Sequence, residues 1–407
     1  MNKKVISNIF SLLVLQGANY ILPLITLPYL VITLGVEKFG ILAFSSAIIR
    51  YFAILIDYGF NLSATREISV ARGNKEKISK IFSSVILIKF FLLLISFFIL
   101  YISSLSFERI SEYQDIYFFT FLMLIGNVLF PIWYFQGIEE MAYITKINIA
   151  SKFFFTALIF LLVHSSSDYW LVPLINSIGF ILGGLVAFII ALKRVSFSLS
   201  SWENIVYHFN NSTNLFISNA SVTLFTASNV FILGLFANDT IVGIYSSIER
   251  LVMAIKNLFV PVYQGIFPWL AKKDIIKIRE FIVKVLPIIS FVALLISLCI
   301  FLFAKEILTL VYSNQEIVKY TYILQLFALV PFLSAINMLF NYLYFNAIKS
   351  YNIRMKIFLI AGIFNVIVAL PLTQKYSIFG LTLSIVLTEV LLLILGVYFF
   401  KIQRINL

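Results

Sequence analysis

The sequence predicts an all-α integral membrane protein with twelve transmembrane helices. Of its 407 residues, 61% are hydrophobic and 12% are charged, whereas soluble domains are about 45–50% apolar and about 25% charged. Apolar runs of roughly 20 residues, the length that crosses a bilayer, recur along the whole chain. None of these runs alternates with a period of two residues, so transmembrane strands are not expected.

Charged or turn-forming residues separate the apolar runs and set the limits of each predicted span. The first run contains Gln16, Asn19 and Pro23 and is too long for a signal peptide, so we interpret it as a retained span. The twelve predicted spans are Ile9–Ile32, Phe39–Leu62, Ile81–Leu105, Ile116–Gln136, Ile147–Val163, Tyr169–Leu192, Thr213–Phe236, Ile241–Trp269, Phe281–Phe303, Tyr320–Asn346, Ile353–Leu372 and Ser377–Phe400.

Composition also limits the chemistry. A single cysteine, Cys299, excludes a disulfide scaffold and a thiolate metal cage, and two histidines, His164 and His208, cannot form a histidine-rich metal site. No Walker motif or glycine-rich phosphate loop is present. We therefore expect no metal and no cofactor.

Lysine and arginine are distributed unevenly between the predicted loops. With both termini cytoplasmic, most of them fall in the inner segments, as the positive-inside rule requires. The formal net charge of +12 then faces the headgroups of membrane lipids, and nucleic acid is not an expected partner.

Unusual residues recur about 200 positions apart, which indicates an internal duplication. Arg50 corresponds to Arg250, Pro131 to Pro331 and Asp57 to Asn257. Six spans per half make the repeats parallel. We expect two six-helix lobes, residues 1–195 and 213–407, joined by a cytoplasmic linker at 196–212 and facing each other across a central cavity.

Several charges lie inside predicted spans. Because a charge at the bilayer centre costs about 2.5–3.5 kcal/mol, it faces water or a partner. The cations that we assign to a water-filled, substrate-binding cavity are Arg50, Lys89, Arg250 and Lys256. The acids Asp57 and Glu249 are candidates for ion coupling. In the alternative interpretation, these charges pair with one another and hold the bundles together.

Polar side chains at helical spacing extend the predicted cavity wall. They are Asn19, Asn214, Ser218, Asn257, Asn337 and Asn341. Such residues also hydrogen-bond neighbouring helices in membranes, so a purely structural role stays open for each. A cationic cavity with amide walls suits an anion that carries hydroxyl groups, such as a pyrophosphate joined to sugars.

Local sequence strings carry a family resemblance. These are LQGANY at 15–20, LPL at 22–24, LPYL at 27–30, LG at 34–35, FG at 39–40, DYGFNLSATREIS at 57–69 and WYFQGIE at 133–139. In these strings the chain resembles the Wzx-type O-antigen flippases. They are members of the polysaccharide transporter family, within the multidrug/oligosaccharidyl-lipid/polysaccharide exporter superfamily.

The resemblance implies two lobes in a V shape that move undecaprenyl-pyrophosphate-linked oligosaccharide across the bacterial inner membrane by alternating access, coupled to H⁺ or Na⁺ and without ATP. It also implies the polymerase and chain-length proteins of the same pathway as partners. Arg50, Lys89 and Arg250 are the positions that could meet the anionic substrate. Arg66, in the second matched string, could contact lipid headgroups or the incoming substrate, or it could simply anchor the inner end of its helix.

Two other classes compete with a flippase. A membrane enzyme such as a polymerase or glycosyltransferase is disfavoured because the outer loops are short and hold no paired carboxylates. A drug/cation antiporter of the same superfamily is disfavoured because a cationic cavity repels cationic substrates.

Overall fold

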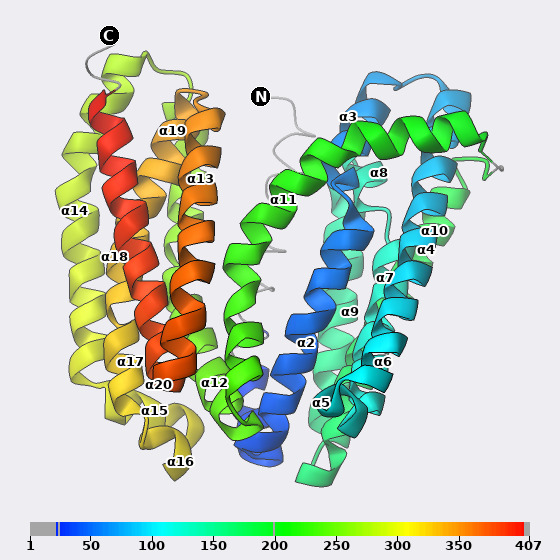
Figure 1. The fold of residues 1–407 in the computed structure, drawn as a ribbon. Helices are drawn as coiled ribbons and strands as arrows, with labels where there is room; N and C mark the ends of the chain where they lie inside the picture. The colour runs from blue at the N-terminus through cyan, green and yellow to red at the C-terminus, as the bar shows by residue number, and fades with distance from the viewer. Residues whose placement is uncertain (1–21, 23–24, 198–199, 403–407) are drawn as a thin grey trace. The chain divides into compact units, whose positions relative to one another are not determined.

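The computed structural model describes residues 22, 25–197 and 200–402, except for the side chains of 214, 218, 219, 221–227 and 268. This part of the chain is helical and contains no strand (Figure 1). Asn19, assigned to the cavity wall, lies outside the described residues. The backbone of Asn214 and Ser218 is helical, but their side chains are not described.

The helices follow one another with short connections. A helix at Ile25–Leu34 comes first. The others are α2 (Val36–Asp57), α3 (Phe60–Val70), α4 (Lys75–Ser106), α5 (Glu108–Glu112), α6 (Gln114–Phe121), α7 (Met123–Leu129), α8 (Ile132–Gly137), α9 (Met141–Leu162), the 3₁₀ turn η1 (Ser166–Trp170), α10 (Leu171–Leu192), α11 (Trp202–Phe236), α12 (Asp239–Lys256), α13 (Phe259–Leu270), α14 (Ile275–Leu302), α15 (Ala304–Tyr312), α16 (Gln315–Val318), α17 (Thr321–Phe327), α18 (Leu329–Met338), the π-helix η2 (Leu339–Tyr344), α19 (Phe345–Ala347) and α20 (Tyr351–Ile402).

Eight helical stretches of the described chain are long and apolar enough to cross a membrane. The predicted class, an all-α protein that crosses the membrane several times, is therefore confirmed. The number twelve stays a prediction, because most of the first predicted span lies outside the described residues. The eighth predicted span is not a single helix. It is divided into α12 and α13, and Asn257 caps the end of α12.

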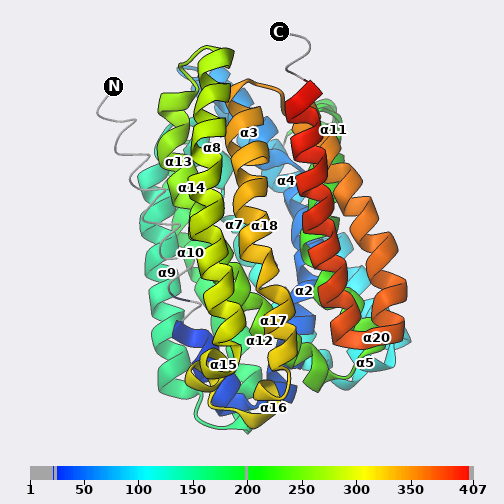
Figure 2. The same ribbon diagram turned by 90° about the vertical axis from the view of Figure 1, so that its left-hand side faces the viewer.

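The last candidate span, Tyr351–Ile402, consists of two helices. Ser377 has φ 50° and ψ −131°, which no α-helix contains, so the chain reverses there. A Cβ on Gly380 would lie 1.9 Å from the Leu372 carbonyl oxygen, so only glycine allows the two halves to approach this closely. The orange and red halves of α20 run side by side in Figures 1 and 2. The break falls at Ser377, the first residue of the predicted twelfth span.

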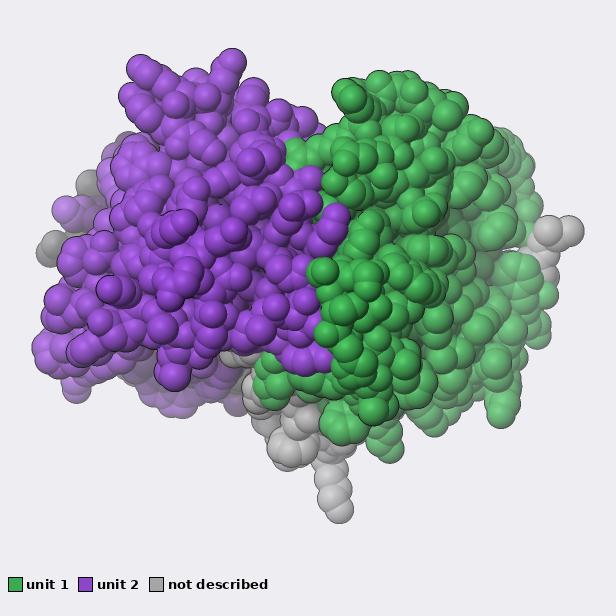
Figure 3. All heavy atoms as spheres, turned by 90° about the horizontal axis from the view of Figure 1, so that it is seen from below, with its two compact units in different colours: residues 1–26, 41–223 green, residues 27–40, 224–407 purple. Residues whose placement is uncertain are grey.

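The chain divides into two compact units. Unit 1 comprises residues 1–26 and 41–223, and unit 2 comprises residues 27–40 and 224–407 (Figure 3). The long helices α2 and α11 contribute to both. The predicted lobe limits at 195 and 213 stay a prediction, and α11 already begins at Trp202, within the segment assigned to the linker.

Small residues bring the helices of unit 1 together. A Cβ on Gly126 of α7 would lie 2.3 Å from the Phe180 carbonyl carbon of α10, and one on Gly184 would lie 2.5 Å from the Gly126 oxygen. Small residues permit such close packing in membranes, where lipid is as apolar as the helices and gives no hydrophobic drive for association. Large apolar side chains such as Phe91 and Phe98 of α4 stay exposed, as lipid contact requires.

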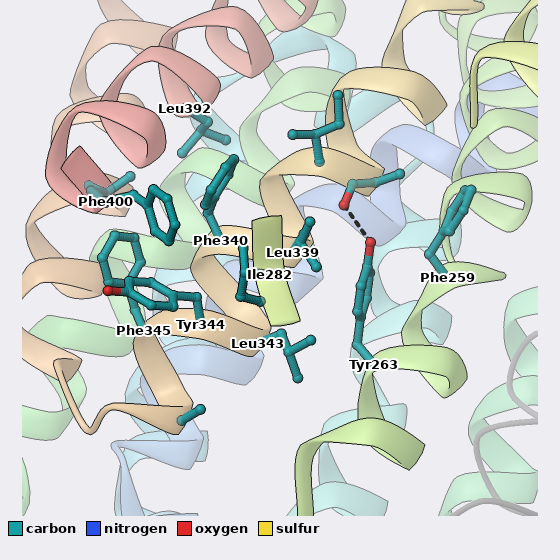
Figure 4. Close-up of a cluster of buried hydrophobic side chains, with 14 of the residues drawn as sticks. Phe259, Tyr263, Ile282, Leu339, Phe340, Leu343, Tyr344, Phe345, Leu392 and Phe400 are labelled. Atoms are coloured by element: carbon teal, nitrogen blue, oxygen red, sulfur yellow. Dashed lines mark hydrogen bonds between the residues drawn. The ribbon is translucent and has the colours of Figure 1, made fainter. Parts of the chain in front are cut away.

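The core of unit 2 lies between α13, α14, α18, η2 and α20 (Figure 4). Phe340, Tyr344 and Phe400 pack ring against ring, with centroids 4.7–5.2 Å apart for the two pairs that involve Phe400. The buried hydroxyl of Tyr263 donates to the Ala335 carbonyl at 2.6 Å, which ties α13 to α18. This core fixes the helices that carry the polar cluster described below.

Two helix glycines of unit 2 should respond to substitution with opposite signs. Gly243→Ala would place a Cβ 1.9 Å from the Val36 carbonyl oxygen, whereas a Cβ on Gly265 meets nothing within 4 Å. We expect Gly243→Ala to lower the thermal unfolding temperature of the detergent-solubilised protein. Gly265→Ala should raise stability by about 0.5–1 kcal/mol, the helix propensity gained. Equal shifts for both variants would contradict the packing of α12 against the start of α2.

Candidate functional site

Lys89, at mid-length of α4, is buried in unit 1 and fully paired. Its Nζ donates to Asp57 Oδ1 at 2.9 Å and to the Asn127 side-chain oxygen at 3.0 Å. The lysine side chain is 2% exposed and that of Asp57 is 31% exposed. We expected Lys89 to face a water-filled cavity. It is buried instead, and α2 and α7 supply the partners that its charge needs.

Arg50 lies two turns before Asp57 on α2 and is exposed. No carboxylate of the described chain forms an ion pair with it. Within unit 1, Arg50 is thus the predicted substrate-binding cation that stays available to a ligand, whereas Lys89 is engaged. Its role in binding stays a prediction.

Unit 2 contains a corresponding buried cluster around Glu389, in the second half of α20. Its Oε1 accepts from Lys256 Nζ and from Ser334 Oγ, each at 2.7 Å, and its Oε2 accepts from Asn337 Nδ2 at 2.6 Å. The side chain of Glu389 is 4% exposed, and that of Lys256 is 20% exposed. The pairing alternative left open by the sequence therefore holds for Lys256 as it does for Lys89.

The other predicted charges of unit 2 lie on α12. Arg250 is exposed, and its guanidinium carbon lies 5.0 Å from the ring centroid of Phe39. Glu249 accepts a 2.8 Å hydrogen bond from the buried Tyr245 hydroxyl. In each unit, one member of a lysine–carboxylate pair thus shares its helix with an exposed arginine: Asp57 with Arg50 on α2, and Lys256 with Arg250 on α12.

The predicted polar wall is divided between buried and accessible positions. Asn337 and Asn341 are 6% and 2% exposed, and in the described structure the Asn337 side-chain oxygen and both polar atoms of the Asn341 amide have no hydrogen-bond partner. Asn257 is half-buried at the end of α12. Buried polar atoms without partners are costly. Asn337 lies two residues before the π-helix η2 and Asn341 lies within it, and this type of irregularity occurs frequently at functional sites.

Arg66 lines a cavity of about 1000 Å³ at the end of α3. The walls come from α3, the start of α4 and the start of α11, all within unit 1, and they include Lys77, Lys80 and His208. We call this space the basic cavity. Figure 1 shows the first turns of α11 lying across the ends of the neighbouring helices.

Several residues of these sites escaped the sequence analysis. Asn127 and the roles of Glu389 and His208 were not predicted, although a lone carboxylate or amide within an apolar span is a signal that a partner exists. The partner itself could not be read from the sequence, because Glu389 lies 133 residues from Lys256. Among the described residues, no group of three histidine, cysteine or acidic side chains could hold a metal ion.

The Glu389 cluster should behave as a buried ion pair. Lys256→Met leaves a buried carboxylate without its cation, so we expect a loss of about 3 kcal/mol in the free energy of unfolding. The double variant Lys256→Met/Glu389→Gln should recover most of that loss, since the neutral amide needs no cation. Its oxygen can accept from Ser334, and its NH2 group can donate to the Asn337 side-chain oxygen once the Asn337 amide turns over. The measurement is equilibrium unfolding in mixed SDS micelles.

The matched control for this prediction is Lys277→Met, whose ion pair with Asp274 is exposed. It should change the free energy of unfolding by less than about 1 kcal/mol. A loss as large in the double variant as in Lys256→Met would show that the charge pairing is not what the cluster needs.

Two curated bacterial proteins are similar to this chain over its whole length. One, from Escherichia coli (strain K12), is 30% identical over 97% of this chain and 96% of its own length. The other, from Shigella dysenteriae, is 29% identical over 95% of this chain and 98% of its own length. Both are provisionally named O-antigen transporters.

Solved structures share the fold. A lipid II flippase, MurJ, in an inward closed conformation superposes with a TM-score of 0.73, at 15% identity over 97% of this chain and 87% of that chain. An inward-facing multidrug resistance MATE transporter of the MOP superfamily gives a TM-score of 0.67, at 14% identity over 94% of each chain. At these identities the likeness concerns the fold.

Residues 5–273 match the family described as polysaccharide biosynthesis proteins. That match covers more than half of the chain, and the full-length similarity to the Escherichia coli protein agrees with it. The chain belongs to the polysaccharide biosynthesis protein family.

Proposed function

We propose that this protein is a flippase that moves undecaprenyl-pyrophosphate-linked O-antigen repeat units, or those of a related polysaccharide, from the inner to the outer leaflet of the bacterial inner membrane. The family, the two relatives named as O-antigen transporters and the fold shared with a lipid II flippase support this proposal. Lobes that alternate in access around a cationic cavity, with both termini in the cytoplasm, belong to the same proposal.

The observation that carries the proposal is that the lysines and the arginines of the apolar helices have different surroundings. Lys89 and Lys256 are paired with carboxylates inside their units, whereas Arg50 and Arg250 are exposed on α2 and α12. Guanidinium groups bind phosphate oxygens in a bidentate manner. Two such groups in a protein of this family suit a pyrophosphate, and they disfavour the drug/cation antiporter that the shared MATE fold would otherwise allow.

The energetic problem that such a protein solves is the passage of a polar headgroup through hydrocarbon. Every unsatisfied polar group costs several kcal/mol there. An amide side chain such as that of the half-buried Asn257 can replace water around sugar hydroxyls, while arginine replaces it around the phosphates. The lipid tail can stay in the bilayer throughout.

Ion coupling completes the proposal, with H⁺ or Na⁺ as the ion. Asp57 and Glu249 remain the proposed coupling groups: Asp57 is partly exposed beside Lys89, and Glu249 is engaged by Tyr245. Protonation of Asp57 would remove the counter-charge of a buried lysine and so favour a different packing of α2 against α4. The polymerase and chain-length proteins of the same pathway are the proposed protein partners.

Removal of both exposed arginines tests the function. We expect Arg50→Ala/Arg250→Ala to abolish long-chain surface polysaccharide when it replaces the chromosomal copy in the source bacterium. The lysine-substituted variant Arg50→Lys/Arg250→Lys should keep part of the activity, because it retains the charge but not the bidentate geometry. The measurement is the surface polysaccharide ladder, together with the amount of inserted protein.

Full polysaccharide in the alanine variant would contradict the role of the two arginines. Equal loss in the alanine and lysine variants at normal insertion would indicate that guanidinium geometry, rather than charge, is required, which is compatible with the proposal.

A further inference from the structure

The side chains that line the basic cavity of unit 1 carry more positive than negative charge. Arg66, Lys77 and Lys80 line it, against one carboxylate, Glu67. Lys80 is engaged by Glu76 at 2.7 Å. No acid of the described chain forms an ion pair with Arg66 or Lys77, although the charge of Glu67 acts on Lys77 through space. Both cations can therefore still contact an anion.

Glu67, which also lines the cavity, is bound by side chains of α11. Its Oε2 lies 2.8 Å from His208 Nδ1, and its Oε1 accepts a 2.6 Å hydrogen bond from the Asn211 amide. Both carboxylate oxygens are thus occupied, and His208 is 7% exposed. These bonds also tie α11 to α3, so the wall that carries Asn204 and Tyr207 is fixed relative to Arg66.

The remaining lining matches the other parts of a glycolipid. Tyr207 is 60% exposed, and an aromatic ring of this kind offers a face to a sugar. Leu62 and Val70 line the cavity from α3 and are 57% and 77% exposed. Trp202, 76% exposed at the start of α11, is the residue type that marks a membrane–water interface. Cations, an aromatic ring and apolar residues therefore meet in one space at the predicted inner surface of the membrane.

We propose that the basic cavity is a docking site for a pyrophosphate-linked glycolipid at the cytoplasmic face, separate from Arg50 and Arg250. Arg66 and Lys77 bind the pyrophosphate, Tyr207 and Asn204 contact the first sugar, and Leu62 and Val70 border the lipid chain. This inference rests on the proposed function and adds a site to it. It also decides the role of Arg66: the residue binds substrate and does not merely anchor its helix by charge.

The test measures binding of undecaprenyl pyrophosphate to the full-length protein in nanodiscs of zwitterionic lipid. We expect Arg66→Ala/Lys77→Ala to weaken binding by about tenfold or more, since two charge-assisted contacts are lost. The matched control, Lys272→Ala/Lys273→Ala, removes two other cations from the predicted inner surface and should leave binding unchanged. The charge-conserving variant Arg66→Lys/Lys77→Arg should retain most of the affinity.

Three further arms identify the source of the anion. Phosphatidylglycerol in large excess should compete weakly because it carries a single phosphodiester, and inorganic pyrophosphate should compete weakly because it has no lipid chain. Undecaprenol without phosphate should not compete. Competition by phosphatidylglycerol as strong as that by undecaprenyl pyrophosphate would overturn the proposal and leave a general lipid-headgroup site. Unchanged affinity in Arg66→Ala/Lys77→Ala would overturn it as well.

The binding measurements distinguish a failure of this inference from a failure of the proposed function. If the unaltered protein binds undecaprenyl pyrophosphate and only Arg50→Ala/Arg250→Ala loses it, the flippase stands and the docking site falls. If the unaltered protein does not bind it at all, both fall. If the variant Arg66→Ala/Lys77→Ala does not insert into the membrane, the single variants Arg66→Gln and Lys77→Gln test the same point. Each should lose affinity for undecaprenyl pyrophosphate several-fold.

Discussion

A charge within an apolar helix needs either a partner or water, and most of this structure follows from that constraint. In unit 1 the ammonium of Lys89 is satisfied by Asp57 and Asn127. In unit 2 the carboxylate of Glu389 is satisfied by Lys256, Ser334 and Asn337. Each cluster joins three helices. Breaking either one would leave an uncompensated buried charge, so the clusters fix which helices are neighbours.

The same constraint separates structural from functional cations. A lysine that already has a carboxylate partner in a low-dielectric surrounding gains little from an incoming anion, because that anion must displace the partner. Arg50, Arg66 and Lys77 have no such partner among the described acids, and Arg250 lies over the ring of Phe39. We therefore propose that exposed cations recognise an anionic headgroup, while the lysine–carboxylate pairs hold together the helices that carry those cations.

The sequence predicted the fold class and the family, but it could not predict the pairing. Hydropathy located the break at Ser377 because turn-forming and charged residues interrupt an apolar run there. Burial of Lys89 depends on α2 and α7 meeting α4 in space, which no local pattern encodes. The same is true of the basic cavity: Arg66 stands in a recognisable string, but its neighbours Lys77 and His208 reach it only through the packing of α4 and α11.

Movement of the lipid between leaflets tests the central claim most directly. The purified protein would be reconstituted into liposomes with a fluorescent undecaprenyl-pyrophosphate oligosaccharide, and the fraction of label reached by an impermeant quencher would be followed with time. The account predicts that the protein makes the label of both leaflets accessible, faster under an applied H⁺ or Na⁺ gradient. Label that stays in its original leaflet, while a fluorescent organic cation is transported instead, would contradict it.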